Sequence, residues 1–156
     1  MRYGILLLLA VVLTASSAHG LFESLSLDYY IDRYNTNIDQ APVILKTILG
    51  SEQVEIRVAL DNGSLLDLGI ETDMGSIISV SYSGIADPSI AIETSEQTID
   101  EVIGSPDPIG AFQQARDRGD IMITANKIPG KIKVSSLLSS MEVLRFFYQR
   151  VFALPA

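Results

Sequence analysis

The sequence contains no cysteine. It can therefore form neither a disulfide framework nor a lipid-modified N-terminal cysteine. The folded chain must obtain its stability from a packed hydrophobic core, and its 47% hydrophobic residues support one.

Histidine is almost absent, since His19 near the N-terminus is the only one. A histidine base and a histidine metal site are thereby excluded from the rest of the chain. No G-x-G-x-x-G or Walker pattern occurs either. Carboxylate pairs such as Asp100 with Glu101 and Asp117 with Asp120 are interpreted as solvated helix faces and turns, because nothing assembles the roughly six to eight oxygen ligands that calcium needs. We expect no enzymatic activity, no cofactor and no metal.

Long apolar runs are also lacking, and the longest extends only from Ile5 to Leu13. A membrane span needs about 20 apolar residues, whereas a secretory leader needs an apolar core of about 7–15 between a charged start and small residues. We interpret residues 1–20 as a signal peptide, cleaved after Ala18-His19-Gly20 or, alternatively, after Ser16-Ser17-Ala18. The expected product begins near Leu21 and is exported, either secreted or associated with the cell surface.

Basic residues are scarce, with 11 Lys and Arg against 19 Asp and Glu and a net charge of −8. Residues 127–156 hold five basic residues against Glu142 alone, a net charge of +4, so the total of −8 leaves −12 for residues 1–126. The acidic body disfavours nucleic acid as a partner. The basic C-terminal segment 127–156 is compatible with binding to an anionic surface. Alternatively, its charges form a solvated helix face and strand edge. Its basic residues are Lys127, Lys131, Lys133, Arg145 and Arg150.

Apolar residues in the first half recur with two different periods. Residues 27–38 and 44–49 follow the helical period, and residues 54–60, 66–71 and 78–82 alternate as half-buried strands do. Turn signals at Asp61-Asn62-Gly63 and Asp73-Met74-Gly75 separate the alternating segments. These patterns predict two short helices followed by an antiparallel meander of three strands.

The second half predicts alternating strands and helices. After a short strand at residues 90–92, Thr94 and Gln97 have the spacing of a capping box and so predict the start of a helix. A second helix follows and ends at Gly119. The residues that share its inner face are Pro108, Ala111, Phe112 and Ala115. A fifth strand at residues 121–125 and a short sixth at Ile132–Val134 follow, and a last helix extends from about Ser135 to Phe152.

The order of these elements between Ala86 and Ala125 carries a family resemblance. A short strand beginning at Asp87-Pro88 leads into a capped helix, and Asp107-Pro108 with Ala111-Phe112 opens a second helix that ends at Gly119 before a strand of alternating apolar residues. In this order the segment resembles the core of the sterol carrier protein type-two family of small lipid-transfer domains. With the preceding meander and helix, the resemblance covers roughly residues 39–134.

This resemblance implies an α+β fold. It comprises a mixed, mostly antiparallel five-stranded sheet with amphipathic helices packed on one face, and an apolar tunnel between sheet and helices that admits a lipid, an acyl chain or a sterol-like molecule. Burial of apolar surface, worth about 25 cal/mol per Å2, would hold such a ligand. The residues that we expect to line the tunnel are Ile99, Val102, Ile103, Phe112 and Met122. The alternative is an ordinary core, because an amphipathic helix buries the same face with or without a ligand.

The C-terminal segment, residues 135–156, is amphipathic as a helix. One stripe, formed by Leu137, Met141, Leu144, Tyr148 and Val151, is sufficient to dock it on the domain. Phe146 lies opposite this stripe, so we expect it to be exposed and, with Phe147, Arg145 and Arg150, to contact a membrane surface or close a ligand entrance as a lid. A frayed tail and an oligomer contact are the alternatives.

The chain is thus divided into a signal peptide at 1–20, a sterol-carrier-like domain at 21–134 that includes the N-terminal helices at 21–50, and the C-terminal helix at 135–156. We expect a non-enzymatic exported domain that binds or carries an apolar ligand. The alternative is a ligand-free structural or interaction module at the cell surface.

Overall fold

The structure is a computed structural model, and it describes residues 24–126, 140–146 and 149–150. Within these ranges the side chains of residues 24–27, Ile103, Met141 and Leu144 are not described. The expected signal peptide, the sixth strand at Ile132–Val134 and Phe147 lie outside the described residues.

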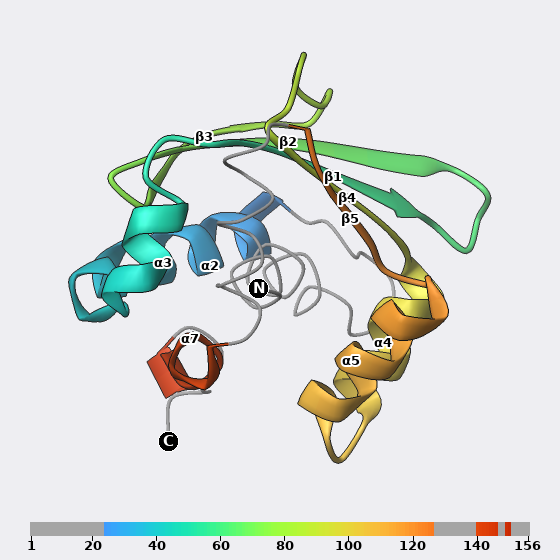
Figure 1. The fold of residues 1–156 in the computed structure, drawn as a ribbon. Helices are drawn as coiled ribbons and strands as arrows, with labels where there is room; N and C mark the ends of the chain where they lie inside the picture. Colours follow the sequence, from blue (N-terminus) through green and yellow to red (C-terminus); the bar gives the residue numbers. More distant parts are fainter. Residues whose placement is uncertain (1–23, 127–139, 147–148, 151–156) are drawn as a thin grey trace.

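A five-stranded sheet with the order β3-β2-β1-β4-β5 forms the centre of the fold (Figure 1). Strands β1 (Gln53–Ala59), β2 (Leu65–Asp73) and β3 (Ser76–Ser81) are antiparallel neighbours, which confirms the predicted meander. The two turn signals are confirmed as well: Gly63 has φ +82° in the first turn, and Met74 and Gly75 have φ 47° and +85° in the second. Positive φ is open to glycine without steric cost, which explains its place in both turns.

The other two strands extend the sheet beyond β1. Strand β4 (Ile90–Ser95) pairs parallel with β1, and β5 (Met122–Ala125) pairs antiparallel with β4. A parallel pair requires a crossover, and the segment between β3 and β4 crosses the sheet, because Gly84 lies close to Gly69 of β2 and to Glu55 of β1. The sheet is therefore mixed and mostly antiparallel, as predicted.

The two faces of the sheet differ in chemistry. Alternation places apolar side chains on one face, and the helices lie on that side in Figure 1. The opposite face carries charged residues, including Glu55, Arg57, Asp67 and Glu93. The strand residues of the apolar face that are buried are Val54, Ile56, Val58, Leu68, Ile70, Ile90 and Ile92.

Helix α2 (Ser24–Asn37) is held to the β2–β3 turn by two of its side chains. The buried Tyr34 phenol donates a hydrogen bond to the Gly75 carbonyl oxygen at 2.6 Å, and burial raises the pKa of Tyr34 above its ordinary value. The Asn35 amide donates to the Ile77 carbonyl oxygen and accepts from the Ile77 N–H, both at 2.8 Å, so it pairs with the edge strand as a backbone would. A short helix η1 (Ile38–Gln40) and α3 (Val43–Ile48) follow.

Helices α4 (Glu96–Gly104) and α5 (Pro108–Arg118) form the second helical group. The predicted N-cap of α4 at Thr94 is wrong by one residue. Ser95 is the N-cap, because its side chain accepts the hydrogen bond from the Thr98 N–H. The Thr94 side chain instead donates to the Asp120 carbonyl oxygen. Asp107 caps α5 as expected by accepting from the Gly110 N–H, and Gly119 ends it in the left-handed conformation.

The C-terminal helix α7 (Met141–Phe146) docks on the domain, and one residue predicted to be exposed is buried. Phe146 is only 6% exposed and, with Val143 three residues before it, belongs to the hydrophobic core. The predicted exposure of Phe146 is therefore wrong. Apolar residues occur nearly all around this helix, so its sequence did not determine which of them face the domain.

Candidate ligand-binding region

Three of the residues predicted to line a tunnel come together under the β4–β5 side of the sheet. Ile99 and Val102 project from α4 and Phe112 from α5, and all three are buried in the same hydrophobic core. The two helices pack against each other, and α4 also contacts β4. Ile103 lies on α4, but its side chain is outside the described part of the structure. Contact of these residues with a ligand remains a prediction.

Met122, the fifth residue of that set, lies on the other face of the sheet. It is opposite Glu93 of β4, whereas the next residue, Ile123, is opposite the buried Ile92. Because side chains alternate along a strand, Met122 projects away from the helices, and its side chain is 52% exposed. Its predicted place among the inner apolar residues is therefore corrected.

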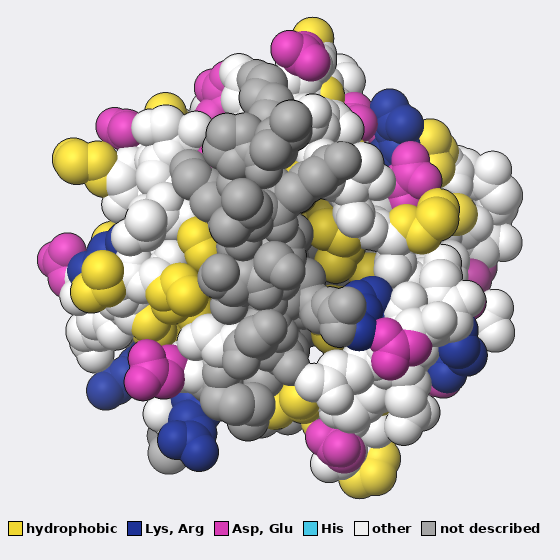
Figure 2. All heavy atoms as spheres, viewed as in Figure 1, with side chains coloured by type: hydrophobic (Ala, Val, Ile, Leu, Met, Phe, Trp, Pro, Cys, Tyr) yellow, Lys and Arg dark blue, Asp and Glu magenta, His cyan; other side chains and the backbone are white. Residues whose placement is uncertain are grey.

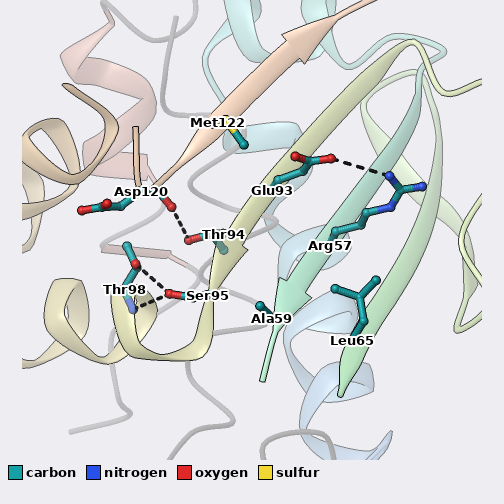
Figure 3. Close-up of a pocket in the computed structure, with 9 residues that line it drawn as sticks. All are labelled: Arg57, Ala59, Leu65, Glu93, Thr94, Ser95, Thr98, Asp120 and Met122. Atoms are coloured by element: carbon teal, nitrogen blue, oxygen red, sulfur yellow. Dashed lines mark hydrogen bonds and ion pairs between the residues drawn. The ribbon is translucent and has the colours of Figure 1, made fainter. Parts of the chain in front are cut away.

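Met122 instead borders a surface hollow of about 490 Å3 on the charged face of the sheet (Figure 3). Arg57 lies there within 4 Å of Glu55, Asp67 and Glu93, and these carboxylates, Glu55 first, raise the pKa of Arg57. The remaining polar groups of the hollow are used in capping α4 and in the bond from Thr94 to the Asp120 carbonyl. This arrangement holds strands and helices in place.

The inner side of the described fold is almost entirely apolar. Of the buried polar residues, Glu55 projects from the outer face of the sheet, and Thr72 and Ser89 bond to the backbone near the start of β1. Thr98 belongs to the cap of α4. The described residues contain no group of three or more His, Cys, Asp or Glu side chains that could hold a metal ion.

Helices α2 to α5 form two groups on the same face of the sheet. In Figure 1, α2 and α3 lie below the β2–β3 side, and α4 with α5 lies below the β4–β5 side. Contacts agree with this division, since α2 packs against β3 and α4 packs against α5 and β4. The predicted packing of amphipathic helices on one face is confirmed.

The described charged side chains on one face of the molecule lie mainly around its rim. On the face seen in Figure 2, acidic side chains are spread around the rim. The carboxylates of Glu101, Asp117 and Asp120 are exposed and pair with Arg118 or Arg116, in agreement with their interpretation as solvated groups.

Arg145 and Arg150, expected to contact a membrane, are exposed. Together with Gln40, Pro42 and the buried Phe146 they border a hollow of about 310 Å3. The Arg33 Nε donates to the Arg150 carbonyl oxygen, which links this end of the chain to α2. No helix among the described residues is long and apolar enough to cross a membrane.

Arg116 is the one polar residue near the inner face of α5 that the sequence patterns did not indicate. It follows Phe112 by four residues, and this spacing places two residues on the same face of a helix. Its side chain is 15% exposed, against 46% for Arg118. The helical spacing from Phe112 was the available signal, but a charged residue is ordinarily assigned to the solvated face.

No protein-family model matches the chain, and no curated protein matches it. Among solved structures, it is similar to the sterol carrier protein domain 2 of Helicoverpa armigera, with 18% identity, a TM-score of 0.46, and 81% of this chain and 89% of that chain covered. It is also similar to the palmitated sterol carrier protein 2-like 2 of Aedes aegypti, with 11% identity and a TM-score of 0.46. That match covers 74% of this chain and 96% of the other. Sterol carrier protein 2 from Yarrowia lipolytica is similar as well, with 14% identity and a TM-score of 0.43. The match covers 77% of this chain and 88% of that chain.

Proposed function

We propose that this protein binds or carries an apolar ligand, a lipid or acyl chain, between the inner face of the sheet and its helices, without enzymatic activity. The observation that carries the proposal is the chemistry of that inner side. Two separate helical groups bury apolar side chains against one apolar sheet face, and the charged groups of the sheet project from the other face. The resemblance of residues 39–134 to the sterol carrier protein type-two family supports the same function.

The physical basis is burial of apolar surface. Each Å2 of ligand surface removed from water contributes about 25 cal/mol, and binding sites for such ligands are lined mainly by apolar side chains with few polar groups. Ile99, Val102 and Phe112 are the described side chains that we assign to this surface, and Ile103 is assigned from the sequence alone. Selectivity between ligands would then depend on the length of the chain and on its head group.

Ligand binding is tested with the purified protein, by native mass spectrometry for co-purifying lipid and by calorimetric titration with dodecanoate and methyl dodecanoate. We expect a complex of one protein with one ligand for at least one of the two probes, and no binding of butyrate, which buries too little apolar surface. A protein that carries no lipid and binds neither twelve-carbon probe would instead be the ligand-free structural module.

The location of the protein outside the cytoplasm is part of the proposal, and the leader pattern of residues 1–20 supports it. We expect N-terminal sequencing of the exported protein to begin near Leu21. Recovery of the chain in a membrane fraction with Met1 retained would contradict both the cleavage and the export.

A further inference from the structure

Arg116 combines a nearly buried position with an incomplete set of hydrogen bonds. Its Nη2 pairs with the Asp117 carboxylate, an exposed group on the next residue. Its Nη1 is buried, and it has no hydrogen-bond partner in the structure. Among the buried side-chain nitrogen and oxygen atoms of the described residues, Nη1 is the one that lacks a hydrogen-bond partner.

The other ion-paired arginines of the described chain differ from Arg116 in this respect. Arg57 lies among three carboxylates, and Arg118, on the same helix, pairs with Glu101 and Asp120. Folded proteins leave few buried polar groups without a partner, because such a group loses its hydration and gains nothing in return. A cationic donor loses more than a neutral one. The unsatisfied Nη1 therefore requires an acceptor that the described residues do not supply.

The surroundings of Arg116 indicate what that acceptor is. On α5 it follows Phe112 and Ala115, both fully buried, so the stem of its side chain lies at the edge of the apolar inner face. The Asp117 carboxylate accepts from Nη2 and leaves the Nη1 donors available. A ligand that fits this place has an apolar body and an oxygen-bearing anionic end.

We propose that Arg116 binds the carboxylate of an acyl ligand whose chain lies against the apolar inner face. This inference rests on the proposed function and specifies the class of ligand. Hydrogen bonds from a guanidinium to a carboxylate are charge-assisted and stronger than neutral ones. Inorganic phosphate presents anionic oxygens of the same chemistry, so the test includes it as a separate probe.

The test compares Arg116→Met with the matched variant Arg118→Met, which removes a paired arginine two residues further along the same helix. Calorimetry with dodecanoate should show at least about tenfold weaker binding to Arg116→Met than to the unaltered protein. Methyl dodecanoate, which has the chain without the charge, should bind both proteins equally. Arg118→Met should bind both probes as the unaltered protein does.

Stability without ligand provides an independent measurement. If Nη1 is free in the ligand-free protein, replacing Arg116 by methionine removes an unsatisfied buried cation, and the urea midpoint of unfolding should stay the same or rise. A lower midpoint for Arg116→Met than for Arg118→Met would show that Arg116 has a structural partner and would overturn the proposal.

The binding outcomes separate this inference from the proposed function. If neither twelve-carbon probe binds the unaltered protein, the proposed function fails and the inference fails with it. If both probes bind and Arg116→Met changes their affinities equally or not at all, only the carboxylate site is wrong. Binding of inorganic phosphate that depends on Arg116 and that dodecanoate cannot displace would identify a free-anion site and overturn the acyl assignment.

Discussion

Replacing Phe112 by alanine is expected to lower the free energy of unfolding by about 3–5 kcal/mol, the usual cost of truncating a buried phenylalanine. The Phe112 side chain has no exposed surface and lies in the core with Ile99 and Val102 of the neighbouring helix. Its removal takes away apolar burial and leaves a cavity in the core beside α4. Urea unfolding followed by circular dichroism measures the change.

The matched control is Gln114→Ala on the same helix, since Gln114 is exposed and alanine is a good helix former. We expect its unfolding free energy to stay within about 0.5 kcal/mol of the unaltered protein. A loss of less than about 1 kcal/mol for Phe112→Ala would contradict the central place of this side chain in the core.

The stability loss of Phe112→Ala does not by itself demonstrate binding. If the inner face also holds a ligand, the affinity for methyl dodecanoate should change in the variant under conditions in which it is folded. A second substitution, Ala111→Trp, adds bulk beside Phe112. A folded Ala111→Trp protein with unchanged ligand uptake would count against a binding surface at this position.

Substitution of Gly69 by alanine is expected to lower the free energy of unfolding by about 3 kcal/mol, at the upper end of the range for overpacking. A Cβ atom at this position in β2 would lie 2.6 Å from the Gly84 carbonyl oxygen and 2.7 Å from the Gly84 carbonyl carbon. Both are backbone atoms of the crossover between β3 and β4. A rotamer change cannot relieve the contact, so the crossover must move away from the sheet.

Gly104→Ala is the control for this substitution. A Cβ atom at Gly104 meets nothing within 4 Å, and its backbone φ is not positive. We expect this variant to be as stable as the unaltered protein or slightly more stable, because alanine favours the helix. If Gly69→Ala unfolds at the same urea concentration as Gly104→Ala, the close approach of the crossover to β2 is wrong.

Local signals in the sequence were sufficient to predict the elements of the fold. Alternation of apolar residues identified β1, β2 and β3, because a strand between a core and solvent exposes every second side chain. Asp107 and Gly119 marked the ends of α5 because each supplies a local hydrogen bond or backbone conformation that the helix end requires. The helical period also placed Ile99, Val102 and Phe112 on buried faces.

Errors arose where two local signals competed. Thr94 and Ser95 are adjacent hydroxyl residues, and either suits a helix N-cap. Because the pairing of β4 with β1 extends to Ser95, α4 begins after this residue and Ser95 is its N-cap. For Met122, the apolar type of the side chain competed with the alternation of residues 121, 123 and 125, and the alternation was the correct signal. The register with β4 places Ile123 opposite the buried Ile92 and Met122 opposite Glu93.

The sequence by itself determined the local elements of this protein, its turns and the apolar character of its inner side, since these depend on residues close together in the chain. Tertiary structure alone decided three further features: which face of α7 is buried at Phe146, why β2 needs glycine at position 69, and that Arg116 has an unsatisfied donor near the apolar face. Each depends on atoms from segments far apart in sequence, or on burial by the folded chain as a whole. No pattern within a single segment contains that information.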